Sequence, residues 1–146
     1  REPRRVRIGK NNNSFAHADV WLRLLQRVTG RADLHHLTTR AWDHLFPTRG
    51  FQSQHLAWCP LCLSADLIPY HRLAWAIQPV RICARHASPL QTNCQRCRKT
   101  LPVIHDRSGV TMCPRCGEDL RIVNENAVAA GCSDFALWTA IEVGQL

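Results

Sequence analysis

The sequence predicts a small α+β protein in which helical segments flank a central region rich in cysteine. Apolar residues recur at helical spacing near both ends of the 146-residue chain. In the middle, short apolar alternations separate closely spaced pairs of cysteine. A chain of this length forms one ordinary domain or a few very small modules. We therefore expect four segments, with these limits: 1–13, 14–50, 55–120 and 121–146.

The first segment, residues 1–13, is predicted to be a basic arm. It combines several cations with Pro3 and an asparagine run, a composition that disfavours an isolated regular element. Two interpretations remain open, a tail that contacts phosphates and a solvated connector at the end of a piece of a longer chain. The cations of the arm are Arg1, Arg4, Arg5, Arg7 and Lys10.

The second segment, residues 14–50, has the pattern of a helical hairpin. In the first helix Ser14 is the expected N-cap and Gly30 the C-terminal stop. In the second, Asp33 is the expected cap and Pro47 the end. A plain packed corner and a helix-turn-helix share this periodicity. The two apolar stripes are Ala18, Trp21, Leu22, Leu25 and Val28, and then Leu34, Leu37, Ala41, Trp42 and Leu45.

The third segment, residues 55–120, carries two sets of metal-ligand spacings. A CxxC pair presents two sulfurs from one tight turn, and tetrahedral zinc needs four such ligands. The downstream set, with fifteen residues between its two pairs, has the spacing of a zinc ribbon. The upstream set has twenty residues between its pairs, and a histidine replaces the last cysteine. The predicted ligands are Cys59, Cys62, Cys83 and His86 for one ion, and Cys94, Cys97, Cys113 and Cys116 for the other.

Sequential pairing of these ligands closes each module on itself and requires no threading of one module through the other. A crossed pairing would also satisfy two ions, with His55, His71 and His105 as possible substitutes. Because four protein ligands leave no open position for water, both zinc ions are expected to be structural. The fold class is thus a zinc-stabilised α+β protein with two tandem zinc-ribbon-like modules.

Short strands are expected inside both modules. In the first, Leu73, Trp75 and Ile77 alternate before Pro79, and the pattern resumes up to Cys83, which predicts a small hairpin with a bent connection. In the second, apolar residues at 101–104 and 110 predict two strands around a turn at 108–109.

The last segment, residues 121–146, regains a helical pattern. Ser133 is the expected cap, and Phe135, Trp138, Ile141 and Glu142 follow in helical register. The chain starts without a methionine and stops within this pattern, so we expect a fragment of a longer polypeptide.

Charge and the absence of targeting signals bound the function. No secretory signal or membrane-length apolar stretch is present, which favours a reducing compartment and metal ligation over disulfides. The net charge of +8 falls to roughly +5 with two zinc ions and seven thiolates. A basic protein favours a polyanionic partner such as nucleic acid. The expected nucleic-acid contacts are Arg4, Arg5, Arg7, Arg96 and Arg98.

The order and spacing of several motifs in residues 37–120 resemble the TniQ/TnsD family of bacterial transposon target-selection proteins. A tryptophan precedes the first cysteine pair, and RLxW, VxxC with a nearby histidine, and two further cysteine pairs follow. Arg98 departs from the pattern, because glycine often follows that pair. The matching stretches are LTTRAWDHLFPTRG (37–50), AWCPLCL (57–63), YHRLAW (70–75), VRICARH (80–86), PL (89–90), CQRC (94–97) and CPRCGEDL (113–120).

This resemblance implies a non-enzymatic adaptor that selects where a transposon inserts and recruits a TnsC-type AAA+ ATPase. Some relatives bind an attachment site on DNA, and others sit on an RNA-guided CRISPR effector complex. The zinc modules would be scaffold, and the protein would be cytoplasmic and nucleoid-associated in a bacterium. The alternative function is a free-standing zinc-ribbon regulator of transcription that binds DNA.

Overall fold

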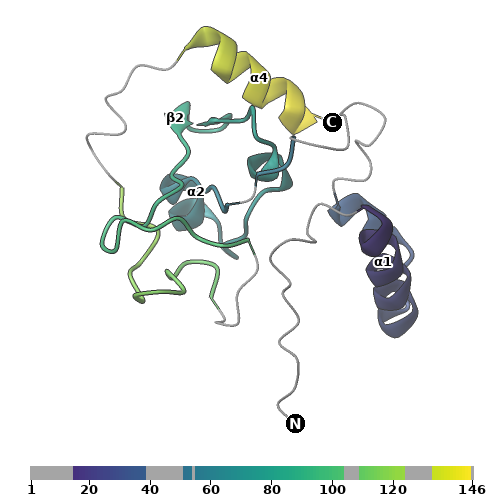
Figure 1. Ribbon diagram of the computed structural model, residues 1–146. Helices are drawn as coiled ribbons and strands as arrows, with labels where there is room; N and C mark the ends of the chain where they lie inside the picture. Colours follow the sequence, from purple (N-terminus) through teal and green to yellow (C-terminus); the bar gives the residue numbers. More distant parts are fainter. Residues whose placement is uncertain (1–14, 39–50, 54, 104–108, 124–132, 146) are drawn as a thin grey trace. The chain divides into compact units, whose positions relative to one another are not determined.

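The computed structural model describes residues 15–38, 51–53, 55–103, 109–123 and 133–145 (Figure 1). These residues contain three α-helices, two 3₁₀ turns and a two-stranded sheet, which confirms the predicted small α+β class. The chain divides into two compact units, residues 1–50 and residues 51–146. No helix among the described residues is long and apolar enough to cross a membrane.

Helix α1, Phe15–Thr29, is the main element of the first unit. It ends at Gly30, whose φ of 70° lies in the left-handed region and whose N–H donates to the Gln26 carbonyl at 2.9 Å. The predicted helix and its glycine stop are therefore confirmed. The predicted cap Ser14 and the basic arm lie outside the described residues.

The second helix of the expected hairpin begins differently from the prediction. Asp33–Leu37 forms a 3₁₀ turn, here called η2, which contacts α1. Its N-cap is Ala32, so the prediction that Asp33 caps a helix was wrong. The reason is that the Asp33 carboxylate instead accepts two hydrogen bonds from the Arg31 guanidinium, at 2.6 and 3.0 Å. Residues 39–50, with the rest of the predicted helix, lie outside the described part.

The second unit begins with short elements that follow the cysteine pairs. Helix α2, Pro60–Ala65, starts directly after Cys59, with proline at its first position, where no N–H is needed. The 3₁₀ turn η4, Leu73–Ala76, follows. Strands β1, Ile82–Cys83, and β2, Ser88–Pro89, then pair antiparallel across the turn that carries His86.

The expected strands were therefore misplaced in the first module. Leu73 to Ala76 forms η4, with the Trp75 N–H donating to the Arg72 carbonyl and the Ile77 N–H to the Ala74 carbonyl. Ile77 does pair, but in an isolated bridge with Gln52, a residue outside the alternating pattern. Five alternating residues predict a strand only if a neighbouring strand is available, and here the available pairing is one residue long.

The second module also lacks the predicted strands in its described residues. Residues 101–103 and 109–111 form no strand, although Pro102 makes an isolated bridge with His55, and residues 104–108, with part of the predicted turn at 108–109, lie outside the described part. Each cysteine pair is instead closed by its own bridge, Asn93 with Thr100 and Met112 with Asp119. In the second module, each pair of ligands is thus flanked by a bridge between its own neighbours.

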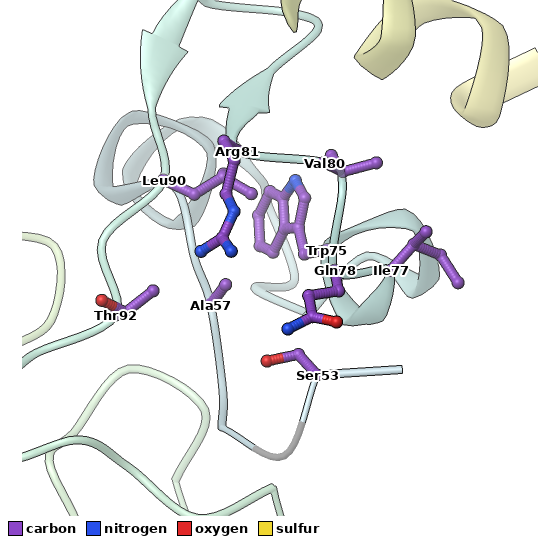
Figure 2. A pocket seen from close by; sticks show the side chains of 9 residues that line it. All are labelled: Ser53, Ala57, Trp75, Ile77, Gln78, Val80, Arg81, Leu90 and Thr92. Atoms are coloured by element: carbon purple, nitrogen blue, oxygen red, sulfur yellow. The ribbon is translucent and has the colours of Figure 1, made fainter. Parts of the chain in front are cut away.

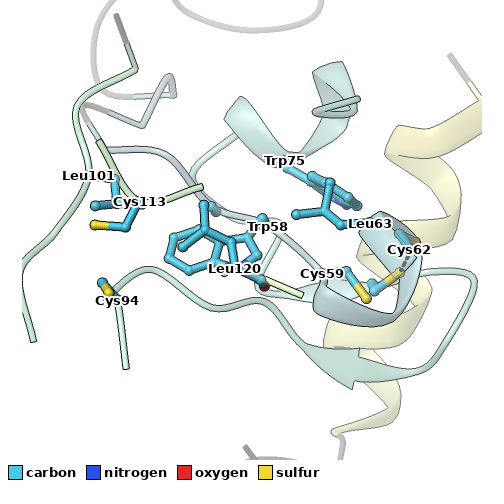
Figure 3. Packing of buried hydrophobic residues seen from close by; sticks show 11 residues of the cluster. Trp58, Cys59, Cys62, Leu63, Trp75, Cys94, Leu101, Cys113 and Leu120 are labelled. Atoms are coloured by element: carbon cyan, nitrogen blue, oxygen red, sulfur yellow. Dashed lines mark hydrogen bonds between the residues drawn. The ribbon is translucent and has the colours of Figure 1, made fainter. Parts of the chain in front are cut away.

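One buried cluster joins the two modules (Figure 3). Its centre is Trp58, which is fully buried and whose indole N–H donates to the Leu120 carbonyl at 3.0 Å. The segment around Trp58 also bonds by its backbone to Leu101 and Gln91. The buried members of the cluster are Ala57, Trp58, Cys59, Cys62, Leu63, Trp75, Cys83, Cys94, Leu101, Cys113 and Leu120.

Helix α4, Asp134–Gln145, packs against β1 and η4, and confirms the predicted C-terminal helix. Its buried side chains are Ala140 and Val143. The apolar residues that carried the prediction, Phe135, Trp138 and Ile141, lie on its exposed side. The helix is thus apolar on both sides, and the smaller side chains face the module.

Candidate metal centres

The first candidate centre gathers side chains from three elements. Cys59 immediately precedes α2, Cys62 lies in its first turn, and Cys83 and His86 belong to β1 and the turn after it. The Nδ1 atom of His86 faces the sulfurs, at 3.2 Å from Cys62, 3.5 Å from Cys59 and 3.7 Å from Cys83. All four ligand atoms lie within 4.8 Å of one another.

The second candidate centre is built from two cysteine pairs that face each other. The sulfurs of Cys94 and Cys116 are 3.6 Å apart, and those of Cys97 and Cys113 are 3.9 Å apart. These four sulfurs also lie within 4.8 Å of one another. The grouping follows the sequential order along the chain and not the crossed alternative.

Both groups fit a tetrahedral metal ion. Zinc–sulfur bonds of about 2.3 Å place the sulfurs of a tetrahedral site about 3.8 Å apart, close to the separations found here. The three cysteines of the first centre are buried, as are Cys94 and Cys113 of the second. Three thiolates with one imidazole, as in the first group, and four thiolates, as in the second, are both donor sets of closed zinc sites. The two clusters are therefore compatible with metal binding, and zinc as the metal stays a prediction.

Three ligand turns share one backbone feature. The residue directly after each turn has a positive φ, 47° at Ala87, 58° at Arg98 and 76° at Gly117. Its N–H donates to the carbonyl of the first cysteine of the turn, at 2.8 to 2.9 Å. This bond folds the backbone around the metal position. Of the three residues, only Gly117 indicates a positive φ from the sequence, because glycine adopts this region of φ readily.

The thiols influence one another strongly before any metal binds. A hydrogen bond from Cys83 lowers the pKa of Cys59 to about 4, and the same contact raises the pKa of Cys83. Burial raises the pKa of Cys94 to about 12. A bound cation would replace the protons on these sulfurs, so metal binding is coupled to proton release.

The second unit also contains a cavity of about 180 Å³ (Figure 2). Its walls combine apolar side chains with the polar groups of Ser53, Gln78 and Arg81, which are drawn in Figure 2. It holds none of the metal ligands. The remaining lining residues are Ala57, Trp75, Ile77, Val80, Leu90 and Thr92.

The arginines predicted to contact nucleic acid fall into two groups. Arg96 and Arg98 are exposed on the turn after Cys94, with Arg96 in a loose ion pair with Glu118 at 3.6 Å. Arg4, Arg5 and Arg7 lie outside the described residues. Their contacts with nucleic acid stay a prediction in both groups.

Two contacts around the centres were not found from the sequence. One is the indole hydrogen bond of Trp58 to Leu120, which spans the two modules. The other is the pairing of Arg72 with Asp66 at 3.0 Å, just after α2. The motif YHRLAW contained Arg72, but nothing in the local spacing indicated which carboxylate it would meet.

The fold and the two ligand groups define a class: a small α+β protein whose modules share one core and each present a closed set of four metal ligands. A family model for TniQ matches residues 10–90, more than half of the 146 residues. The chain therefore belongs to the TniQ family, a family of non-catalytic adaptors associated with transposition. No curated protein matches the sequence.

Proposed function

We propose that this chain is a non-enzymatic adaptor for transposon target-site selection. It would bind target DNA or an RNA-guided effector complex and recruit a TnsC-type AAA+ ATPase. Membership of the TniQ family is the single observation that carries the proposal, because it already associates the chain with transposition. The proposal also keeps the four predicted segments, which are the basic arm 1–13, the helical segment 14–50, the metal-binding modules 55–120 and the C-terminal segment 121–146.

The metal centres support a scaffold role within this proposal. If each group binds zinc, four protein ligands fill the coordination shell and leave no position for a catalytic water. Each ion would then contribute on the order of 10 kcal/mol or more to folding, which a core this thin needs. Partner contacts would fall to exposed side chains around the centres and to the basic arm.

Nucleic-acid contact is assigned to Arg4, Arg5, Arg7, Arg96 and Arg98. The support for Arg98 is its backbone, since a bulky residue occupies a position with φ of 58° that glycine adopts with less strain. A use for the long exposed side chain would explain why arginine and not glycine occupies this strained position. Together with Arg96 it places two guanidinium groups on one turn of the second module.

The test combines the zinc-loaded protein with duplex DNA and, separately, with the cognate TnsC-type ATPase in ATP. An adaptor binds the ATPase, and its DNA affinity falls steeply with salt because phosphate contacts release counterions. The variant R96Q/R98Q should lower the slope of log affinity against log salt by about 2. R121Q is the matched control, because Asp119 already engages that guanidinium.

The alternative function is a free-standing zinc-ribbon DNA-binding regulator of transcription. It predicts tight, sequence-specific DNA binding with no association with the ATPase. Binding of the ATPase in the absence of DNA would exclude it as the sole function. Unchanged DNA affinity and salt slope in R96Q/R98Q would remove those two arginines from the proposal.

A further inference from the structure

The cavity of about 180 Å³ in the second unit combines fixed apolar walls with two polar side chains that reach solvent (Figure 2). Five of its nine lining residues are apolar, and Trp75, Ile77 and Val80 among them are at most 4% exposed. Gln78 and Arg81, which also line it, are exposed. A ligand in this cavity would therefore meet an apolar surface and a positive charge at the same time.

The guanidinium of Arg81 has no carboxylate partner in the described part of the chain. None of the lining residues is acidic, whereas other arginines of the second unit are paired with acids. These paired arginines are Arg72, Arg85, Arg96 and Arg121. An exposed guanidinium keeps all of its five N–H donors for a ligand when it lacks an internal partner.

Of the neutral polar groups in the cavity, the Gln78 amide is the one best suited to join Arg81. The Ser53 hydroxyl is already used, because it donates to the His55 carbonyl at 2.7 Å. The Gln78 side chain makes no hydrogen bond within the described residues. In Figure 2 its amide and the Arg81 guanidinium both point toward Ala57. The two side chains thus present N–H donors to one place.

Backbone hydrogen bonds frame the cavity from two sides. Segment 51–53 bonds to segment 76–78 through two contacts, at 2.6 and 2.7 Å. Segment 90–91 bonds to Arg81 and Trp58 through three contacts, at 2.8 to 2.9 Å. Lining residues lie in or next to each of these segments. The cavity is therefore formed before a ligand arrives, and binding requires little reorganisation.

The size and the charge of the cavity limit what it can bind. Its volume is below the roughly 300–1,000 Å³ of pockets for drug-sized ligands, so a nucleotide with base, ribose and phosphate is too large. A planar guanidinium forms two parallel hydrogen bonds with a carboxylate, and an amide N–H can add a third. The apolar walls match a few branched carbon atoms next to that carboxylate.

We propose that this cavity binds a short branched aliphatic carboxylate. The aliphatic group contacts Trp75, Val80 and Leu90, and the carboxylate accepts hydrogen bonds from Arg81 and Gln78. A free short-chain acid has this chemistry, and so does the carboxyl terminus of a peptide that ends in an aliphatic residue. The proposal is independent of the proposed function, because the cavity holds neither a metal ligand nor an arginine assigned to nucleic acid.

The experiment titrates the purified, isotope-labelled chain with isovalerate, acetate, isovaleramide and N-acetyl-leucine, and follows the backbone amide signals by NMR. Isovalerate is expected to bind about tenfold or more tightly than acetate, which lacks the aliphatic group, and than isovaleramide, which lacks the charge. The shifts should centre on residues 76–81 and 90–92. Binding of N-acetyl-leucine more tightly than isovalerate would support a peptide terminus as the ligand, and weaker binding would support a free acid.

Three variants test the role of the guanidinium. R81Q should weaken isovalerate binding about tenfold or more, with unchanged circular dichroism, because the side chain is exposed. R81K keeps the charge without the planar fork and should bind less tightly than the wild type. R115Q is the matched control, since Arg115 is exposed and does not line the cavity, and it should bind as the wild type does.

Several results would overturn the proposal. One is the absence of amide shifts with both isovalerate and N-acetyl-leucine. Others are equal affinity for isovaleramide, unchanged affinity in R81Q, and shifts confined to residues outside the cavity. Inorganic phosphate that binds at the same residues as tightly as isovalerate would show a general anion site and would also overturn it.

Discussion

The residue after a ligand turn adopts a positive φ three times in this chain, and three different residue types occupy it. Ala87, Arg98 and Gly117 make the same backbone hydrogen bond, so the turn imposes the conformation whatever the side chain. Non-glycine residues tolerate it at a cost of roughly 1–2 kcal/mol. The proposed nucleic-acid contact of Arg98 would therefore come at the expense of stability.

The substitution R98G should stabilise the protein while weakening nucleic-acid binding. Relief of the left-handed strain, less the added entropy of the unfolded chain, predicts a gain of up to about 1 kcal/mol. The opposite change, G117A, adds a side chain at a φ of 76° and should lower the free energy of unfolding by about 1 kcal/mol. Urea unfolding at fixed free zinc measures both. A less stable R98G would contradict the strain argument.

Trp58 links the two modules by a hydrogen bond from its indole N–H to the Leu120 carbonyl. W58F keeps most of the buried surface but leaves the Leu120 carbonyl without its indole donor. We expect a loss of about 1–3 kcal/mol in the free energy of unfolding. W138F, at a tryptophan that is 56% exposed, is the control and should change stability by less than about 0.5 kcal/mol. Equal effects would argue against the bridging role of Trp58.

At the scale of elements, α4 is joined to the second unit through small side chains. V143A removes two buried methyl groups against β1 and η4 and should cost about 2 kcal/mol. F135A removes a larger side chain, but one that is 73% exposed, and should be close to neutral. Chemical denaturation followed by circular dichroism distinguishes the two. A larger loss in F135A would mean that the exposed side of α4 is covered in solution.

The elements that could be predicted from sequence are those fixed by local chemistry. The grouping of Cys94 with Cys116 followed from the spacing of two CxxC pairs, each set within one turn, and the end of α1 followed from Gly30, which also acts within a turn. The strand expected at Leu73 failed because a strand needs a partner, and Ile77 meets only Gln52. The pairing of Arg72 with Asp66 was equally invisible, since it depends on how the loop returns.

For the molecule as a whole, binding of zinc should displace protons from the cysteine thiols. With the pKa of Cys94 raised to about 12 by burial, this thiol holds its proton at any physiological pH, so zinc must displace it. Zinc affinity should therefore fall as pH falls, with net proton release on binding. Calorimetric titration in buffers of different ionisation enthalpy measures the release. A pH-independent affinity between pH 6 and 8 would contradict thiolate ligation.

Removal of metal should unfold part of the second unit, which contains both ligand groups. A strong chelator is expected to abolish amide-exchange protection in residues 55–120, where the core is thin and both ligand groups lie. Substitution of one ligand, C116A, should lower the zinc content from two ions to one per chain, as elemental analysis would show. Full protection in chelator would mean that the core alone sustains the fold.

Because the two modules share one core, the position at which the chain is truncated should matter. The family match ends at residue 90, but the cluster around Trp58 is completed by Leu101, Cys113 and Leu120. A fragment that stopped at the family boundary would keep every ligand of the first centre and yet expose the indole face and its unpaired N–H. The segment that the family model matches is therefore shorter than the segment whose side chains complete the buried core.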